Sequence, residues 1–409
     1  MKIAFLLPQN IIGGGHLTVY KHASHLQSVG HDVAIIYRDY VPGRDQQMIG
    51  DFNFNILLFD EIFTAPPKFD VIFATWWETL YDIFIFESSY YFYYTQSDER
   101  RFYEDPKEIK LRFCELTYRF DKVGFIAVAT WLQKMLLAEG GIRAKVVPNG
   151  FDPTVFNASD RKYEDGRKLR VLVEGHGNIW FRRIDDCFEA LNGVENIEVW
   201  FVSRDGFTKP AWKYDKMYVN ISSGEMAEVY SACDVLLKMS EVESFCLPNL
   251  EMMACGGSII TTNFTGQEEY AVNGYNSLVI PIRDVKAARE AVLKLRDDRT
   301  LLKTLQSNAL ATTINMTWDI QTNKFEAAMN ELMDELKDYD YTNLRKRILL
   351  IREIKLAGEV SEMEKNKLAR DYQDLFRQFH RKEYSAFRFA GRMIYGIPLL
   401  GPLLRRLFQ

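Results

Sequence analysis

Several features that mark large classes of protein are missing from this sequence. Its 409 residues include only five cysteines, and no two of them form a CxxC pair, which argues against zinc ligands or a disulfide framework and favours reduced thiols. No apolar segment reaches about 18 residues, so no membrane-spanning helix is expected. The net charge of −5 gives no bulk indication of nucleic-acid binding. The opening segment, MKIAFLLPQN, suits a first strand rather than a secretory signal.

The length of the chain and the order of its apolar segments predict two domains. A chain of 409 residues exceeds what one hydrophobic core usually holds. Short apolar strand candidates alternate with helical segments over residues 1–155, and the alternation restarts after a polar linker at 156–168. Such alternation is typical of parallel sheets with right-handed crossovers. We therefore predict an α/β fold with two Rossmann-like, doubly wound domains, 1–155 and 165–325, facing across a cleft in which ligands bind.

The C-terminal part of the chain has a different composition. Residues 326–384 are densely charged with spaced apolar residues, which predicts a helical extension, either a solvated amphipathic pair or a coiled-coil surface for an oligomer. Residues 385–409 contain four arginines, no acid and many apolar side chains broken by glycine and proline. This tail suits an anionic membrane surface, with packing on protein as the alternative. We expect a cytoplasmic protein, peripherally associated with the inner face of the cell membrane.

One stretch of the second domain, residues 234–257, combines several signals. Its sequence is DVLLKMSEVESFCLPNLEMMACGG, in which 235–237 predicts a buried strand and 247–254 has apolar residues at helical spacing. Glu243 and Glu251 lie roughly 12 Å apart along a helix axis at about 1.5 Å per residue. That length can separate a sugar from a ribose. The open amides at the helix start suit the phosphates between them.

These features resemble retaining glycosyltransferase family 4, whose E-x7-E signature has the spacing of Glu243 and Glu251. Residues 147–152, VPNGFD, are similar to the PNGVD segment with which that family crosses between its domains. The segments at 232–236 and 256–260 also resemble strands of the family, so the match is strong in the second domain. The resemblance implies the GT-B fold. It also implies transfer of a sugar from a nucleotide-diphosphate donor to a glycan or lipid-linked acceptor.

The resemblance assigns roles to the residues between the two acids. Glu243 would act in catalysis by facing the donor sugar hydroxyls, and Glu251 would take the ribose hydroxyls. The amides of Ser244, Phe245 and Cys246 would meet the diphosphate. The alternatives are a helix-start acid that only complements the dipole, for Glu243, and an exposed carboxylate, for Glu251.

The diphosphate also needs fixed cations. The lysine-glycine of the family is replaced here by Arg182 and Arg183, which can clamp phosphate bidentately. Arg182 is further expected to stabilise the leaving diphosphate. Lys238, at a strand end, is a third candidate, and either arginine could instead be a solvated helix-start residue. Because no DxD motif precedes a strand end, no divalent metal or other cofactor is expected.

A glycine-rich turn opens the first domain. Gly14 and Gly15 follow the first predicted strand, and the resemblance implies that donor or acceptor approaches the backbone here. The alternative is a flexible turn before a helix. The turn lacks the GxGxxG spacing of a dinucleotide fingerprint.

The stretch 90–103, YYFYYTQSDERRFY, looks like the YFVQDxE segment of bacterial rhamnosyltransferases that build surface glycans. This likeness implies an acceptor site in which Asp98 or Glu99 takes the acceptor proton. A salt bridge within the loop, to a neighbouring arginine, is the alternative. Trp76 and Trp77 end another predicted strand on the same rim, where aromatic faces suit a sugar or simply belong to the core.

The predicted reaction is therefore transfer of a sugar, with rhamnose from dTDP-rhamnose as one candidate, in cell-surface polysaccharide synthesis. Family 4 favours retention of the anomeric configuration, whereas a rhamnosyltransferase can invert it. A sugar-nucleotide 2-epimerase of the same fold is a competing enzyme. A catalytically inactive glycosyltransferase-like scaffold is a non-enzymatic alternative.

Overall fold

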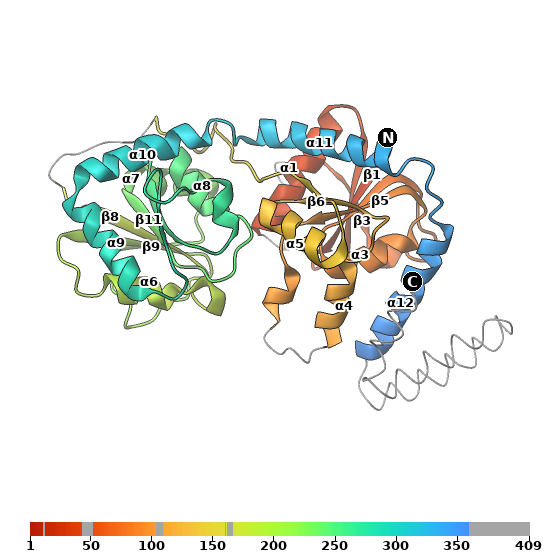
Figure 1. Ribbon diagram of the computed structural model, residues 1–409, viewed down its shortest axis with the longest axis horizontal. Helices are drawn as coiled ribbons and strands as arrows, with labels where there is room; N and C mark the ends of the chain where they lie inside the picture. Colours follow the sequence, from red (N-terminus) through yellow and green to blue (C-terminus); the bar gives the residue numbers. More distant parts are fainter. Residues whose placement is uncertain (11–12, 43–51, 104–108, 160, 162–166, 360–409) are drawn as a thin grey trace.

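The structure, a computed structural model, describes the chain except for residues 11–12, 43–51, 104–108, 160, 162–166 and 360–409. Two α/β domains lie next to each other, and a long helix runs from the second back along the first (Figure 1). The predicted basic tail at 385–409, and the end of the predicted extension, fall outside the described residues. No described helix combines the length and the apolarity needed to cross a membrane.

The first domain is built on a parallel sheet of seven strands in the order β3-β2-β1-β4-β5-β6-β7. Its strands are β1 (Lys2–Gln9), β2 (Asp32–Asp39), β3 (Asn55–Leu58), β4 (Phe69–Ala74), β5 (Ser88–Thr95), β6 (Gly124–Ala127) and β7 (Lys145–Val146). Its helices are α1 (Gly14–Ser28), α2 (Phe59–Ile62), α3 (Trp77–Asp82), η2 (Ile83–Ile85), η3 (Glu99–Phe102), α4 (Ile109–Thr117) and α5 (Thr130–Gly140). The strand order reverses between β1 and β4, and β1 pairs in parallel with both β2 and β4. Ligands bind at such a reversal.

The second domain repeats this order with six parallel strands, β10-β9-β8-β11-β12-β13. Its strands are β8 (Leu169–Gly175), β9 (Ile197–Ser203), β10 (Lys216–Val219), β11 (Val235–Lys238), β12 (Ser258–Thr262) and β13 (Leu278–Ile280). Its helices are η4 (Trp180–Arg182), α6 (Ile184–Leu191), α7 (Ser223–Ala232), α8 (Leu247–Ala254), η5 (Gly266–Glu269), α9 (Val285–Asp297) and α10 (Arg299–Thr313). The predicted pair of Rossmann-like, doubly wound sheets is confirmed.

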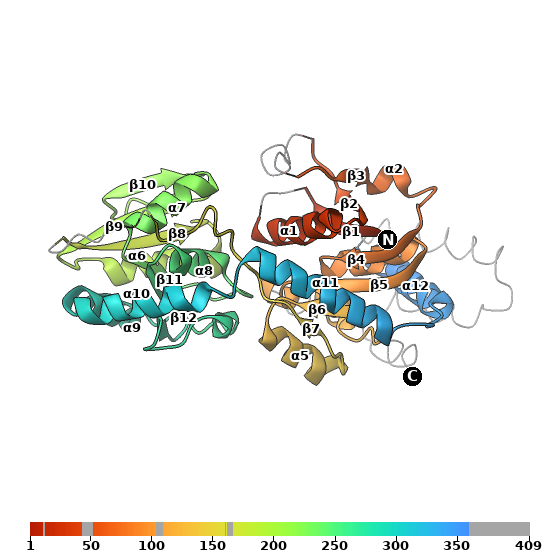
Figure 2. The ribbon, with the colours of Figure 1, turned by 90° about the horizontal axis from the view of Figure 1, so that it is seen from above.

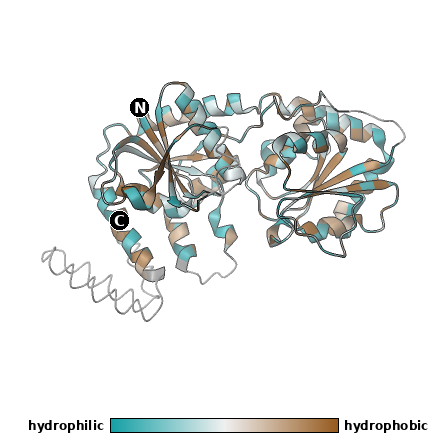
Figure 3. Cartoon of the chain, turned by 180° about the vertical axis from the view of Figure 1, so that it is seen from behind, coloured by the Kyte–Doolittle hydropathy of each residue, from teal (hydrophilic) through white to brown (hydrophobic). Residues whose placement is uncertain are grey.

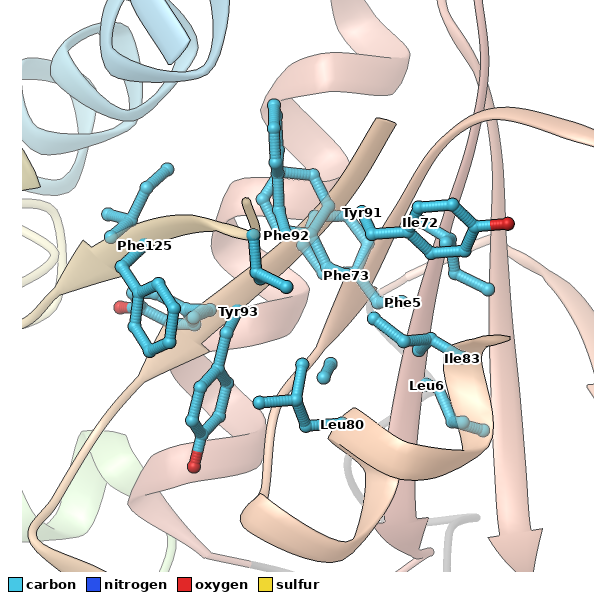
Figure 4. Packing of buried hydrophobic residues seen from close by; sticks show 14 of the residues in the cluster. Phe5, Leu6, Ile72, Phe73, Leu80, Ile83, Tyr91, Phe92, Tyr93 and Phe125 are labelled. Carbon is cyan, nitrogen blue, oxygen red and sulfur yellow. The ribbon is translucent and has the colours of Figure 1, made fainter. Parts of the chain in front are cut away.

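Both sheets are apolar because helices cover both of their faces. Figure 3 shows apolar strands inside each domain and polar residues gathered on the outer helices. In the first domain the core is aromatic: Phe5 stacks on Phe73 with ring centroids 4.6 Å apart, and Phe92 of β5 packs against Phe73 at 5.3 Å (Figure 4). Tyr93, the next residue of β5, packs against Phe125 instead. The aromatic part of the stretch at 90–103 is therefore largely a central strand of the core.

The chain crosses between the domains twice at one place. Phe151 forms a parallel bridge with Thr317, next to the start of α11. The polar segment predicted as a linker, 156–168, lies after this crossing, because Phe156 is already buried in the core of the second domain. The polar composition of 156–168 therefore did not mark the place where the chain crosses between the domains. The crossing is formed by backbone hydrogen bonds between Phe151 and the segment around Thr317, which composition does not reveal.

The charged extension folds onto the first domain through two helices, α11 (Trp318–Glu335) and α12 (Thr342–Glu359). Phe325 of α11 lies in the core of the first domain, and Ile348 and Ile351 of α12 are fully buried there. The Arg352 guanidinium donates to the Asp82 carboxylate at 2.6 Å. Figures 1 and 2 show both helices lying along this domain. Over the described residues, the prediction of a solvated pair is thus wrong, and the apolar face that a coiled coil needs is already covered.

Candidate active site

The loop between β11 and α8 is held by its carbonyl groups. The indole N–H of Trp131, from the first domain, donates to the Ser244 carbonyl at 3.1 Å. The Tyr270 hydroxyl donates to the carbonyls of Phe245 and Cys246 at 2.6 and 3.3 Å. In the described part of the chain, the amides of the same three loop residues have no hydrogen-bond acceptor. A fixed loop whose N–H groups are open at a helix start is suited to an anion.

Cys246 gives this loop its shape. It caps α8 in the left-handed region, with φ 67° and ψ 79°, which a residue with a side chain adopts at a cost of about 1 kcal/mol or more. The side chain of Cys246 itself is buried, which raises the pKa of its thiol and fits the prediction of a reduced core cysteine.

Glu243 and Arg182 meet at the start of this loop. Their carboxylate and guanidinium form a direct ion pair, although the two residues come from different crossovers of the sheet. The Arg182 guanidinium also lies over the ring of Phe181, 5.3 Å from its centroid. The structure thus brings together the acid and the cation predicted for catalysis, with the opposite charges neutralising each other.

Glu251 occupies the second turn of α8 and lies near a buried charge cluster. The Tyr230 hydroxyl donates to its carboxylate at 3.5 Å. Loss of hydration raises the pKa of Glu251 to about 7, against the effect of the nearby Arg204 guanidinium. A buried carboxylate with a pKa this close to neutrality lacks hydration. Hydrogen bonds from a ligand would stabilise its charged form, and such groups are frequent at functional sites.

Lys238 is engaged by Glu174 within the domain. Its side chain is 3% exposed, and its ammonium donates to the Glu174 carboxylate and carbonyl at 3.0 and 2.8 Å. Burial opposes the charge of Glu174, but Lys238 and Arg204 hold its pKa down at about 2. The sequence could not reveal this pairing, because Glu174 lies on another strand. The structure therefore gives less support to Lys238 as a phosphate ligand than to Arg182.

Arg183 and Arg204 also depart from the expected set. Arg183 sits at a positive φ of 53° and donates from two nitrogens to the Asp186 carboxylate of its own helix, at 2.9 and 3.0 Å. Arg204, at the end of β9, was missed by the sequence reasoning. It donates from Nε to Glu174 at 3.1 Å and keeps about a third of its side chain, 34%, exposed. Its position just after a strand end was the available signal.

Gly14 and Gly15 lie where the two domains meet. A methyl group placed on Gly14 would be 3.7 Å from Cδ1 of Leu247, the first residue of α8. A methyl group on Gly15 would be 3.1 Å from Oε1 of Gln96. The starts of α1 and α8 therefore face the same junction. The absence of side chains at the glycines keeps the backbone of α1 within reach of a ligand bound there.

The first domain also contacts the loop before α8 through Arg101. Its Nη2 donates to the Glu241 carbonyl at 3.0 Å, and its guanidinium lies over the ring of Trp131, 5.5 Å from the centroid. Contacts from both domains thus position the loop that carries Glu243.

The two acids proposed for the acceptor proton are otherwise engaged. Asp98 caps η3 and accepts from Arg100 Nε and Nη2 at 2.7 and 3.0 Å, which is the alternative of a salt bridge in the loop. Glu99 is fully buried and accepts from the hydroxyls of Tyr93 and Tyr118. The turn of η3 directs Glu99 into the core. The structure thus does not support proton transfer by either acid.

Glu99 makes a testable contribution to stability. Burial raises its pKa to about 7. The folded state therefore holds a proton that the unfolded chain has released, so the free energy of unfolding falls as pH rises from about 4.5 to about 7. Glutamine at this position does not titrate, so Glu99→Gln removes the part of the pH-dependent fall in the free energy of unfolding that comes from this group. We expect urea unfolding to show the variant gaining on the order of 3 kcal/mol relative to the native chain between pH 4.5 and 8.

Glu115→Gln, an exposed change on α4 of the same domain, is the matched control. Its stability difference from the native chain should stay flat over the same pH range. A flat difference for Glu99→Gln as well would contradict the pKa assignment. Titration of other groups cancels, because it is common to both chains.

The described residues contain no group of three or more His, Cys, Asp or Glu side chains arranged to hold a metal ion. The cationic side chains described near α8 are those of Arg182, Arg204 and Lys238.

Comparison with known proteins shows what part of the chain resembles. Residues 215–312, from β10 to α10, match the family model for glycosyl transferases group 1. An uncharacterized glycosyltransferase from Methanocaldococcus jannaschii is 28% identical over 228 residues, covering 55% of this chain and 63% of that protein. The D-inositol 3-phosphate glycosyltransferase of Stackebrandtia nassauensis is 28% identical over 204 residues, covering 43% of this chain and 46% of that protein. The matches thus span about half to two thirds of the relatives' lengths.

Solved structures show the same fold at low sequence identity. Anabaena HepE in complex with UDP-glucose aligns with a TM-score of 0.68 at 15% identity, over 81% of this chain and all of that one, 100%. Sucrose-phosphate synthase from Thermosynechococcus elongatus aligns with a TM-score of 0.64 at 16% identity, over 82% and 100%. The chain thus has the GT-B fold, and its residues 215–312 match the family model for glycosyl transferases group 1.

Proposed function

We propose that the protein moves a sugar from a nucleotide-diphosphate donor to a glycan or lipid-linked acceptor. The observation that carries this proposal is the Glu243–Arg182 pair beside the open start of α8, with Glu251 in the second turn of that helix. A nucleotide sugar presents a sugar, a diphosphate and a ribose in that order. The segment offers a carboxylate, open amides with a cation, and a second carboxylate in the same order, so each part of the donor has a chemically matched group.

Binding of the donor would separate the ion pair. Glu243 would accept hydrogen bonds from the hydroxyls of the sugar, while Arg182 would turn to the diphosphate. When the bond between C1 and the phosphate oxygen breaks, negative charge develops on the leaving group. Arg182 and the open amides are placed to stabilise that charge, which is the larger part of catalysis in such sites.

Retention of the anomeric configuration is the outcome we propose. Glu99 is buried and Asp98 is held by Arg100, so a phosphate oxygen of the leaving group is the base in this proposal. The acceptor oxygen bonds to C1, the C1–phosphate bond breaks, and the acceptor proton passes to the phosphate. NMR of the product linkage distinguishes this from inversion.

The donor and the pathway are proposed from the sequence and from the relatives. The stretch at 90–103 suggests rhamnose from dTDP-rhamnose and cell-surface polysaccharide synthesis. A serotype-specific mannosyltransferase of Escherichia coli is 28% identical over 98 residues, and the structure of WaaG, a glycosyltransferase of lipopolysaccharide biosynthesis, aligns with a TM-score of 0.60. Both support a role in surface glycans. Ranking dTDP, UDP and GDP by thermal shift tests the base, because stabilisation follows affinity.

Replacing Glu251 by alanine should weaken nucleotide binding. A hydrogen bond to a charged group contributes about 1.5–3 kcal/mol, so the calorimetric Kd for the best-binding nucleotide diphosphate should rise about tenfold to a hundredfold. Glu228→Ala, an exposed change on α7, is the control and should bind like the native chain. Unchanged affinity in Glu251→Ala would remove this residue from the ribose site.

Nucleotide release from each sugar donor separates the enzymatic alternatives. Release that depends on acceptor supports the transferase, and conversion of the nucleotide sugar into its C2 epimer without an acceptor points to the epimerase reaction. No turnover with any nucleotide sugar would favour an inactive scaffold.

Association with the inner face of the membrane remains a proposal carried by the composition of residues 385–409. Deleting these residues should abolish co-sedimentation with anionic liposomes, because the four arginines and the apolar side chains act together at such a surface. Equal co-sedimentation of the full and the shortened chain would refute the membrane tail.

A further inference from the structure

Four aromatic rings form a line across the boundary between the domains. Trp76, after β4, lies 5.8 Å from Phe102 of η3, measured between ring centroids. Phe102 lies 5.7 Å from Phe181 of η4, and Phe181 lies 5.4 Å from Trp180. We call these four residues the aromatic strip. Trp77, the neighbour of Trp76, is fully buried and belongs to the core.

Two members of the strip are exposed to solvent, whereas most aromatic side chains among the described residues are buried or half-buried. Phe102 is 37% exposed and Trp180 is 43% exposed. The other exposed phenylalanine, tyrosine and tryptophan side chains among the described residues are single ones, at Phe63, Phe207 and Tyr275. Trp76 and Phe181 are half-buried, so the strip as a whole keeps apolar surface in contact with solvent. A cluster of partly exposed aromatic side chains is typical of a surface that binds another molecule.

The strip ends at the groups proposed for catalysis. Arg182, which pairs with Glu243, lies over the Phe181 ring. The Phe181 carbonyl also accepts from the Glu241 amide at 2.8 Å, which joins η4 to the loop before α8. The other end, Trp76, follows β4 at the carboxyl edge of the first sheet. A molecule lying on the strip would therefore pass from the first domain to the place where the sugar is transferred.

We propose that the aromatic strip binds consecutive sugar rings of a glycan acceptor. This inference rests on the proposed function and names the substrate class of the same site. One face of a pyranose carries C–H groups that pack on an aromatic ring, while its rim carries hydroxyls. The strip supplies the rings, and the neighbouring Arg101 and Arg182 supply hydrogen-bond donors.

The charges beside the strip select the sugar part of an acceptor over a lipid chain. A lipid chain requires an apolar groove without charged walls, because a buried unpaired charge is costly. Arg182 borders the strip directly, and Arg101 precedes Phe102 in η3. The hydroxyl of Ser97, after β5, is buried without a partner, and it adds a polar group at the same edge of the first sheet.

The test uses two single variants, Phe102→Ala and Trp180→Ala, in the full chain. Both side chains are exposed, so both variants should fold. The probes are fluorescently labelled tetrasaccharides of rhamnose, mannose, galactose and glucose, titrated with the best-binding nucleotide diphosphate present. We expect the native chain to bind at least one of them. Loss of one stacked ring should raise its Kd about tenfold in each variant, from the apolar area no longer covered.

The controls separate stacking from structural damage. Trp180→Phe should restore most of the affinity, because it keeps an aromatic face. Phe63→Ala and Tyr275→Ala remove exposed aromatic rings elsewhere and should bind within twofold of the native chain, on the order of experimental scatter. Affinity for the nucleotide diphosphate should be unchanged in both strip variants.

The outcomes distinguish this inference from the proposed function. Native affinity for tetrasaccharide in both strip variants, or no tetrasaccharide bound by the native chain, would overturn the inference while nucleotide binding still stands. Failure to bind any nucleotide would instead overturn the proposed function, since the tetrasaccharide titration can be read without nucleotide. Binding of a polyprenyl phosphate in place of the tetrasaccharides, lost in the same variants, would also count against it.

Discussion

Replacing Glu243 by glutamine is expected to reduce release of nucleotide from the sugar donor by about a hundredfold to a thousandfold. The substitution keeps the size of the side chain and removes the charge that pairs with Arg182. Affinity for free nucleotide diphosphate should stay the same or increase, because Arg182 loses its internal partner and is then free for phosphate. Coupled measurement of turnover and calorimetric affinity on the same preparation reads both effects.

Glu241→Gln is the matched control, two positions earlier in the same loop. The Glu241 carboxylate pairs with Arg283, whose side chain is largely exposed, and this pair is separate from the one between Glu243 and Arg182. Turnover should remain within about twofold, as for other surface changes. Equal losses in the two variants would assign the effect to the loop, and native turnover in Glu243→Gln would exclude this carboxylate from the reaction.

Replacing Phe325 by alanine should lower the free energy of unfolding of the first domain by about 3–5 kcal/mol. Phe325 is fully buried, stacks on His22 at 4.1 Å, and lies 5.3 Å from both Phe73 and Tyr94, measured between ring centroids. Removing its ring leaves a cavity in the middle of the aromatic core. Urea unfolding followed by fluorescence measures the change.

Phe63→Ala is the same substitution at a side chain that is 47% exposed. It should cost less than about 1 kcal/mol, because little apolar area is uncovered. A similarly small loss in Phe325→Ala would show that α11 only lies against the first domain and does not help to form its core.

Most of the fold could be predicted from the residues that are close to each other in the sequence. The strand and helix predicted at 235–237 and 247–254 are present as Val235–Lys238 and Leu247–Ala254. Buried strands of a parallel sheet are continuous apolar runs, and each run is read from a few neighbouring residues. The same reasoning placed Glu243 and Glu251 on either side of a helix start.

Properties that depend on distant residues could not be predicted in this way. Glu174 lies on β8 and pairs with Lys238 on the neighbouring strand β11, so the sequence around Lys238 does not indicate this ion pair. A single turn of η3 decides that Glu99 is buried. For α12, the apolar spacing indicated that one face would be covered, but spacing carries no information about which domain covers it.

The position of α11 and α12 has a consequence for the order of events on the ribosome. Ile351 completes a core that also contains strands from the first 146 residues. About 200 further residues must therefore be translated before that core can close, which takes roughly 10–40 s at about 5–20 residues per second. The second domain, whose last helix ends at Thr313, is fully synthesised in the meantime. The domain that is translated first is the one that is finished last, so its nascent aromatic sheet is where we expect chaperones to be needed.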